Sequence, residues 1–505
     1  MALSPVEAYE KLVARSREVA LLSSAVALSQ WDQRVLLPPK GGEYRGSLIA
    51  YLATLRHDRF TAPEVGDWLA IVESGDLVCD PESDAAANTR ELRHSYDRET
   101  KLPGELVAEQ AAAAVAGEAA WVQAREQGDF ALFAPALQRL VSLAVRVAEA
   151  VGYGAEVYDA LIDEYEPGFT AAQAAEVLGG LRSELVPLVD RICGADHQPR
   201  GGIMARHYPV EAQDALTRAV LMAVGFDLEA GRIDTSVHAF SEMLGVGDTR
   251  LTTRYNPDDF REGLLGALHE AGHGLYNQGL DPVYAGTPLG SSVSHGIHES
   301  QARLWENAVG HSPAFWAHFF PQAQRLFPEA LGDVPQDDFV FALNDVKRTF
   351  IRVDADEVTY NLHIMLRFEL ERELIARRLA VKDLPEAWNE GFARLFGVPV
   401  TDDRQGCLQD VHWSCGWFGY FPTYALGNIY AAQLWAKASG DLGDLERSFA
   451  RGDFSALREW LRDNVHRHGS RYPAAVLVEK VTGQPPSSGP LLAYLRGRYE
   501  PMYRL

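Results

Sequence analysis

The chain of 505 residues is poor in lysine, and its basic residues are outnumbered by acidic ones. Seven of its 47 basic residues are lysines, against 70 aspartates and glutamates, and the formal net charge is −23. Because phosphate contacts need clustered cations, this balance argues against nucleic-acid binding. The same shortage of cations disfavours a polybasic membrane anchor.

Cysteine is also scarce, and long apolar runs are missing. The four cysteines form no CxxC pair, which disfavours a disulfide scaffold and a cysteine-ligated zinc site. We therefore expect reduced thiols in a cytoplasmic protein. No uncharged apolar run reaches ~18 residues, so no membrane-spanning helix is predicted. The early charged residues Glu7, Glu10 and Lys11 do not fit a signal peptide.

Strand signals are sparse, whereas helical periodicity recurs along the whole chain. With 47% apolar and 23% charged residues, the composition provides a large core. Predicted helices cover residues 5–30, 104–127, 133–151, 170–193, 208–225, 358–379, 423–439 and 455–466. Only in the stretch 230–256 do apolar residues alternate enough to predict a short sheet. We expect one mostly helical domain over 1–505, undivided or with two lobes around a cleft.

One further helix is predicted over residues 256–279, NPDDFREGLLGALHEAGHGLYNQG. Asn256 is a good N-cap and Pro257 suits the first helical position. Gly279 is a natural C-terminal stop. The apolar residues that surround its two histidines predict a buried helix.

This helix carries His269, Glu270 and His273 in a His-Glu-x-x-His arrangement. Residues i and i+4 share a helix face, so both imidazoles can bind one Zn²⁺. Glu270 lies about 100° further round the helix and can take a proton from a water on the metal. Zinc lowers the pKa of that water towards ~7, which enables attack on a peptide carbonyl.

A catalytic zinc usually has a third protein ligand and one open position. The extended motif HExxHxxGxxH is excluded, because Tyr276 and Gly279 stand where it needs glycine and histidine. A carboxylate from a helix that follows in the sequence therefore remains as the candidate for the third ligand.

The segment 294–310, SHGIHESQARLWENAVG, is predicted to be that helix. Its Glu299 and Glu306 lie about two turns apart on one face, and spacing alone does not choose between them. His295 and His298 are rival ligands from the same helix.

These motifs resemble the carboxypeptidase Taq family of zinc carboxypeptidases. HEAGH at 269–273 is followed by HESQ at 298–301. Three further motifs occur in order: DTRLT at 248–252, IRVDAD at 351–356 and GCLQDVHW at 406–413. The resemblance spans nearly the whole chain. One departure is that the family's His-Pro-Phe appears here as His238-Ala239-Phe240.

The resemblance implies a nearly all-helical fold like that of neurolysin and angiotensin-converting enzyme, with a deep groove. It implies Glu299 as the third ligand and Glu270 as the general base. It also implies a homodimer that removes C-terminal residues with broad specificity. Zinc is the implied metal, and cobalt is expected to substitute for it.

A carboxypeptidase must bind a free C-terminal carboxylate, which arginine does with two parallel hydrogen bonds. Arg352 is the first candidate, and a structural ion pair with Asp354 or Asp356 is its alternative. Arg250 is the second candidate. Asp356 could instead accept the outer N–H of a ligand histidine or cap a helix.

The aromatic stretch 412–424 offers donors for a developing oxyanion. We expect Tyr420 to serve as donor, with His412 and Tyr424 assisting or binding substrate, although packing is the alternative for such a stretch. His238 is a candidate contact for the substrate backbone.

The leading hypothesis is thus a cytoplasmic zinc metallocarboxypeptidase. One alternative is a zinc oligopeptidase that cuts internal bonds or releases dipeptides. Another is an inactive helical interaction protein with a structural zinc, but such a site would be closed by four protein ligands and would not need Glu270.

Overall fold

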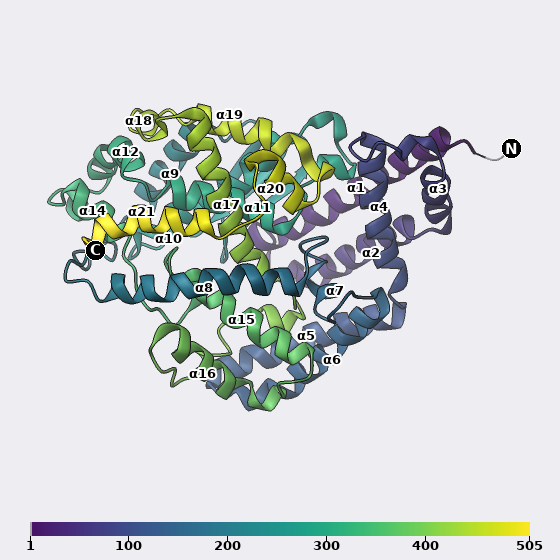
Figure 1. Cartoon of the computed structure of the whole chain (residues 1–505), viewed down its shortest axis with the longest axis horizontal. Coiled ribbons are helices and arrows are strands. Elements are labelled where there is room, and N and C mark those ends of the chain that lie inside the picture. Colours follow the sequence, from purple (N-terminus) through teal and green to yellow (C-terminus); the bar gives the residue numbers. More distant parts are fainter. Residues whose placement is uncertain (1–2) are drawn as a thin grey trace. The chain divides into compact units, whose positions relative to one another are not determined.

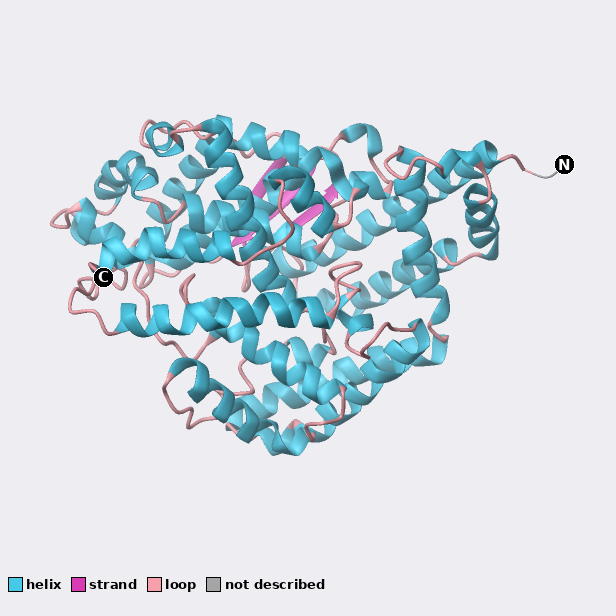
Figure 2. Ribbon diagram, in the orientation of Figure 1, coloured by secondary structure: helices cyan, strands magenta, loops and turns pink. Residues whose placement is uncertain are grey.

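The computed structural model describes residues 3–505 and confirms a mostly helical fold (Figures 1 and 2). Strands occur in one small sheet only, as far as the described residues go. No helix within residues 3–505 is long and apolar enough to cross a membrane.

Residue contacts divide the chain into two compact units. Unit 1 comprises Met1–Glu99, Pro199–Leu343 and Ala431–Pro485, and unit 2 comprises Thr100–Gln198, Asn344–Tyr430 and Pro486–Leu505. The helices of unit 1 are α1 (Pro5–Val35), α2 (Gly42–Phe60), α3 (Pro63–Glu73), α9 (Val210–Val224), α10 (Phe260–Gly279), α11 (His295–Arg303), α12 (Pro313–Leu326), α13 (Pro328–Leu331), α14 (Gln336–Leu343), α18 (Leu445–Phe449), α19 (Ser455–Asn464) and α20 (Ala474–Thr482). Those of unit 2 are α5 (Gly104–Gln127), α6 (Ala134–Val151), α7 (Asp159–Ile162), α8 (Ala171–Cys193), α15 (Tyr360–Ile375), α16 (Leu384–Phe396) and α21 (Gly489–Tyr503). The helices α4 (Asp84–Lys101) and α17 (Phe421–Leu442) have residues in both units.

The helices predicted from periodicity are present, with ends that shift by a few residues. The predicted start of the motif helix was wrong. Asp259, not Asn256, is the N-cap of α10, and its carboxylate accepts a hydrogen bond from the Arg261 N–H at 2.9 Å. The Asn256 side chain instead accepts from the Asp258 N–H at 3.0 Å, in the turn before the helix.

The expected short sheet lies within the stretch 230–256. Its strands β1 (Gly231–Thr235), β2 (Ser241–Gly245) and β3 (Asp248–Thr253) are ordered β1-β3-β2. Strand β3 pairs in parallel with β1 and antiparallel with β2. On β3, Leu251 and Thr253 are buried, and the Thr253 hydroxyl donates to the Gly263 carbonyl of α10 at 2.8 Å. The sheet therefore supports one side of the motif helix.

Helix α10 is the buried centre of unit 1, and two glycines let its neighbours approach closely. A Cβ on Gly272 would lie 2.5 Å from the Ala302 Cα and the Gln301 carbonyl oxygen of α11. A Cβ on Gly274 would lie 2.7 Å from the Phe226 ring. The contact at Gly272 lets α11 lie directly against the turn of α10 that holds His269 and His273.

We predict that Gly272→Ala lowers the free energy of unfolding by about 1–3 kcal/mol, because the new methyl group meets backbone that cannot rotate away. Gly266→Ala on the same helix is the matched control, since its Cβ meets only the Thr253 Oγ1 at 3.7 Å. There the better helix propensity of alanine should give equal or higher stability. Chemical denaturation measures both, and equal stabilities would contradict the close crossing.

Candidate metal centre

Three side chains of unit 1 converge on one point. His269 and His273 stand one turn apart on α10, and Glu299 faces them from α11. The Glu299 Oε2 lies 3.7 Å from the His269 Nε2 and 3.6 Å from the His273 Nε2. One donor atom from each residue lies within 4.8 Å of the others. These separations exceed a hydrogen bond, and they are close to the ~3.4 Å between ligands of a tetrahedral zinc with bonds of about 2.0–2.1 Å.

The charge at this point also fits a divalent cation. Glu270, Glu299 and Glu306 provide three carboxylates, whereas Arg303 provides one guanidinium. With both histidines neutral, as a bound metal requires, the formal excess is two negative charges, in a place where Glu270 and Glu299 are each 7% exposed. Two imidazoles and a carboxylate are a common zinc ligand set. The residues present therefore fit a bound Zn²⁺.

Glu306 plays a different part from Glu299, although sequence spacing put both on one face. Its Oε2 lies 2.8 Å from the His269 Nδ1 and accepts a 3.0 Å hydrogen bond from Arg303. Glu299 lies within α11, whereas Glu306 lies in the π-helical segment Leu304–Val309 that follows it, where the rotation per residue differs. Glu306 thus holds the outer nitrogen of an imidazole, the arrangement that fixes the tautomer of a metal-ligating histidine.

Arg303 ties the two carboxylates together, because its Nε donates to the Glu299 Oε1 at 2.7 Å. Although burial alone would raise the pKa of Glu306, Arg303 and His269 lower it to about 2. Sequence reasoning missed Arg303. The signal was its position four residues after Glu299, the spacing at which opposite charges meet on a helix.

The rival ligands from α11 lie elsewhere. The His298 ring stacks on that of His273, with centroids 4.3 Å apart and an angle of 18°. Its Nε2 lies 3.2 Å from the Asn277 Oδ1. His295 is exposed at the first position of α11. Neither belongs to the group of converging donor atoms, so the stacked ring of His298 orients His273 instead.

Burial acts differently on the groups around this point. It raises the pKa of Glu270 to about 7, against the opposing effect of His269. Burial, aided by His269, lowers the pKa of His273 well below its usual value, which favours the neutral imidazole that a metal needs. Burial alone would lower the pKa of His269 too, but Glu299 and Glu306 raise it to about 9. The carboxylates of Glu299 and Glu306 therefore favour a positive charge at His269.

A second group of predicted residues gathers in unit 2 around Arg352. Its Nε and NH2 donate to the Asp410 Oδ1 at 2.9 and 2.8 Å, and its NH1 donates to the Tyr360 hydroxyl at 2.9 Å. The ion-pair partner is thus Asp410, not Asp354 or Asp356. Arg367 donates to the other oxygen of the same carboxylate at 2.6 Å. Two guanidiniums share one carboxylate, which leaves a buried excess of positive charge.

His412, Tyr420 and Tyr424 lie together beside this pair. The His412 Nε2 is 3.2 Å from the Tyr424 hydroxyl, and the ring centroids of His412 and Tyr420 are 5.5 Å apart. The Arg352 guanidinium lies over the Tyr424 ring, 5.1 Å from its centroid. Burial lowers the pKa of His412 to about 3, although Asp410 opposes this, so the imidazole is neutral.

The buried Glu371, which sequence reasoning missed, holds the backbone of this aromatic stretch. Its carboxylate accepts hydrogen bonds from the Trp413 indole at 2.7 Å and from the Gly419 N–H at 3.0 Å. The Tyr158 hydroxyl donates to it as well, at 2.6 Å. These bonds fix the residues on either side of Tyr420.

The remaining predicted residues have simpler surroundings. Arg250 donates to both oxygens of Asp248 at 2.9 Å and lies over the Trp31 ring, 4.2 Å from its centroid. His238 is exposed in the connection between β1 and β2. Asp356 accepts hydrogen bonds from the Thr359 hydroxyl and N–H, so it caps a turn instead of holding a ligand histidine.

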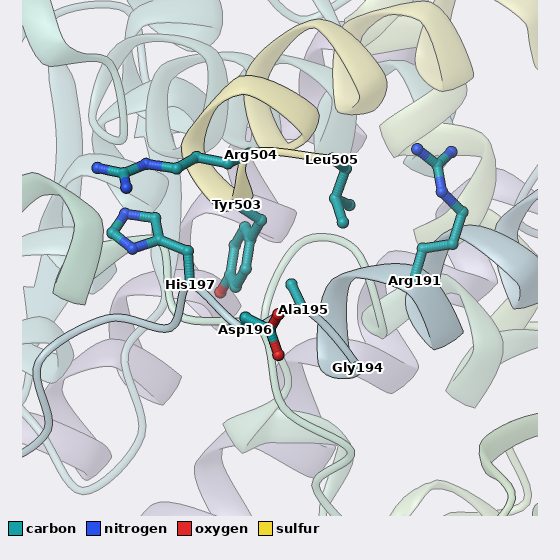
Figure 3. Close-up of a pocket in the computed structure, with 8 residues that line it drawn as sticks. All are labelled: Arg191, Gly194, Ala195, Asp196, His197, Tyr503, Arg504 and Leu505. Carbon is teal, nitrogen blue, oxygen red and sulfur yellow. The ribbon is translucent and has the colours of Figure 1, made fainter.

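A pocket of about 560 Å³ in unit 2 contains none of these residues (Figure 3). It lies between the C-terminal ends of α8 and α21, where the side chains of His197 and Arg504 extend to the same side. Arg191, at its edge, is paired with Glu500 at 2.8 Å. The pocket brings together no group of donors comparable with the candidate metal centre.

Comparisons with known proteins agree with this geometry. The family model described as carboxypeptidase Taq (M32) metallopeptidase matches residues 11–499. Thermostable carboxypeptidase 1 of Thermus thermophilus is 48% identical, over 99% of this chain and all of that protein. Carboxypeptidase 1 of Bacillus subtilis is 35% identical over 97% of each chain. The crystal structure of the M32 carboxypeptidase from Deinococcus radiodurans superposes with a TM-score of 0.95, at 41% identity over 99% of this chain and all of that one.

We predict that Glu306→Ala weakens zinc binding by about 10–100-fold, because His269 loses the partner of its outer nitrogen. Competition with a chromophoric chelator measures the affinity. Glu262→Ala is the matched control, since this acid lies on α10 but is paired with Arg254 at the surface. If Glu306→Ala and the wild type bound zinc with equal affinity, Glu306 would not be needed as the partner of the His269 Nδ1.

Proposed function

The chain belongs to the carboxypeptidase Taq family of metallopeptidases, and from this premise we propose that it is a zinc metallocarboxypeptidase of broad specificity that works in the cytoplasm as a homodimer. The observation that supports the proposal most is the convergence of His269, His273 and Glu299, with two excess negative charges around them. Family membership favours removal of C-terminal residues over cleavage of internal bonds.

In this proposal His269, His273 and Glu299 hold Zn²⁺, and Co²⁺ can substitute because it accepts the same nitrogen and oxygen ligands. When bound, the metal acts as a Lewis acid that polarises a carbonyl and makes a coordinated water more acidic. Three protein ligands leave a position open for water and substrate, as in catalytic rather than structural zinc sites.

Glu270 is the proposed general base. It follows His269 directly on α10, is buried, and does not belong to the converging donor group. It takes a proton from the attacking water and later delivers a proton to the leaving amine. Its burial keeps competing water from the carboxylate.

Recognition of the substrate's free carboxylate is assigned to Arg352. The two guanidiniums around Asp410 leave one positive charge uncompensated, and burial strengthens its attraction for an anion. Arg250, the other candidate, is also paired, but there one carboxylate, Asp248, balances one guanidinium. The proposed recognition of the substrate's C-terminal carboxylate therefore depends on Arg352.

Tyr420 is the proposed donor to the developing oxyanion, because a preorganised hydroxyl stabilises charge that appears only in the transition state. His412 is neutral and can donate or accept a hydrogen bond, and with Tyr424 it is proposed to bind the substrate. His238, on the exposed connection before β2, is proposed to contact the peptide backbone.

A peptide ladder tests the reaction class. Incubation of short peptides with the zinc-loaded enzyme should release residues stepwise from the C-terminus, as followed by mass spectrometry, and C-terminal amidation should abolish cleavage. Retained cleavage of amidated peptides would indicate an oligopeptidase instead.

Glu270→Gln tests the mechanism. The variant should bind zinc as the wild type does but lose about 10²–10⁴-fold in kcat, because no carboxylate accepts the proton of water. Metal content and hydrolysis are measured on the same preparation. An active variant would rule out Glu270 as the base.

Arg352→Gln tests carboxylate recognition. We predict a rise in KM of about 10–100-fold, because a charge-assisted hydrogen bond to the substrate is lost. Arg250→Gln is the matched control, since this arginine is balanced by Asp248 alone. It should leave KM unchanged. An unchanged KM for Arg352→Gln would place the carboxylate site elsewhere.

A further inference from the structure

Residues 158–166 (YDALIDEYE), here called the α7 loop, form a firmly held segment of unit 2. The Asp159 carboxylate accepts hydrogen bonds from the Ala155 and Glu156 N–H groups, each at 3.0 Å. It also accepts from the Ala171 N–H at 2.8 Å, at the first position of α8. Three backbone donors on one carboxylate tie the beginning of the loop to the segments before and after it.

The far end of the α7 loop is held in the same way. Glu166 is 1% exposed, and its carboxylate accepts a 3.0 Å hydrogen bond from the Tyr430 hydroxyl of α17. The Asp163 carboxylate accepts from the Gly168 N–H at 2.8 Å. Because both ends are fixed, the loop is a rigid support for whatever packs against it.

The first contact of the loop with the aromatic stretch 412–424 is made by backbone. Gly419, directly before Tyr420, has a φ of +88°, which favours glycine. A Cβ at this position would lie 2.5 Å from the carbonyl carbon and oxygen of Leu161 in the loop. The chain next to Tyr420 therefore lies directly on the α7 loop.

The second contact joins two aromatic rings. The Tyr165 ring of the loop meets the Tyr420 ring in a T-shaped arrangement, with centroids 5.0 Å apart and an angle of 78°. Within the aromatic stretch itself, Tyr424 and His412 lie slightly further from Tyr420, with centroids at 5.2 and 5.5 Å. An edge-to-face contact is directional, so Tyr165 restricts how the Tyr420 ring can turn.

The third contact passes through the buried Glu371. Its Oε2 accepts from the Tyr158 hydroxyl of the loop at 2.6 Å and from the Gly419 N–H at 3.0 Å. Its Oε1 accepts from the Trp413 indole at 2.7 Å. An indole and a backbone N–H can only donate, so an amide at position 371 would set its own N–H₂ against a donor. The link between the loop and the aromatic stretch thus requires a carboxylate.

We propose that the α7 loop is the positioning element for the Tyr420 hydroxyl, acting through the Tyr165 ring and through Glu371. The proposal rests on the assignment of Tyr420 as oxyanion donor in the proposed function. Such a donor must lie within about 2.7–3.1 Å of the developing charge, and a small misplacement is costly. Tyr165 and Glu371 are therefore positioning residues that affect catalysis by holding Tyr420.

A double-mutant cycle on the zinc-loaded full chain tests the proposal through kcat and KM for peptide hydrolysis. Tyr420→Phe should lose about 10²–10³-fold in kcat, as expected for removal of one oxyanion donor. Tyr165→Leu should lose at least about 10-fold in kcat with KM unchanged, because the hydroxyl is misplaced. Combined with Tyr420→Phe, Tyr165→Leu should cause no further loss, since no hydroxyl remains to be held.

Glu371→Gln should behave as Tyr165→Leu does, and thermal unfolding of each variant shows whether it is folded. Since Tyr165 is only half-buried, its variant keeps the test independent of any loss of stability in Glu371→Gln. Tyr153→Leu is the matched control, because this tyrosine lies in the connection before α7 and is 46% exposed. It should leave kcat and KM unchanged.

The possible failures are distinguishable. If Tyr420→Phe is slow but Tyr165→Leu has the kcat of the wild type, the positioning role is wrong and the oxyanion assignment stands. The same holds if Tyr165→Leu lowers kcat by the same factor with and without Tyr420→Phe, as a packing role alone would do. If Tyr420→Phe keeps the kcat of the wild type, the oxyanion assignment fails and the positioning role fails with it.

Discussion

The close crossing of α10 and α11 at Gly272 is the contact on which the candidate metal centre depends. With no side chain at this position, the backbone of Gln301 and Ala302 lies directly against the helix that carries His269 and His273. Glu299, on the same turn of α11, then meets both imidazoles at 3.6–3.7 Å. A wider separation of the helices would move the carboxylate out of reach of a shared cation.

Near that crossing, two glutamates face different nitrogen atoms of the histidines. Glu299 faces the imidazole nitrogens that converge on the metal position, whereas Glu306 binds the outer nitrogen of His269. Arg303 bonds to both carboxylates and thereby limits their mutual repulsion. In unit 2 the balance has the opposite sign, because Arg352 and Arg367 share Asp410. The acidic chain thus holds a local excess of negative charge for a cation and a separate excess of positive charge for an anion.

Much of the metal centre could be predicted from the sequence because its pattern is local. Two histidines four apart share a helix face whatever the fold, and the apolar residues around them predicted a buried helix. The choice between Glu299 and Glu306 was not accessible, since it depends on how α11 lies against α10 in space. Periodicity also found the helical class and the short sheet. The N-cap was misplaced because Asn256 and Asp259 both have capping side chains.

The other predictions were limited by contacts between residues that lie far apart in the sequence. Asp354 and Asp356 were the expected partners of Arg352 because they are neighbours in sequence, but the partner is Asp410, 58 residues away. The surroundings of Tyr420 could not be foreseen either, since Tyr165 and Glu371 come from segments far from it in the sequence.

The most direct test of the central claim is anomalous diffraction at the zinc absorption edge from crystals of the zinc-loaded protein. One strong peak is expected, bonded to the His269 and His273 Nε2 atoms and a Glu299 oxygen, at about 2.0–2.2 Å from each. Glu306 should remain hydrogen-bonded to His269 without reaching the metal. A peak coordinated by Glu306 in place of Glu299, or zinc bound only elsewhere, would contradict it.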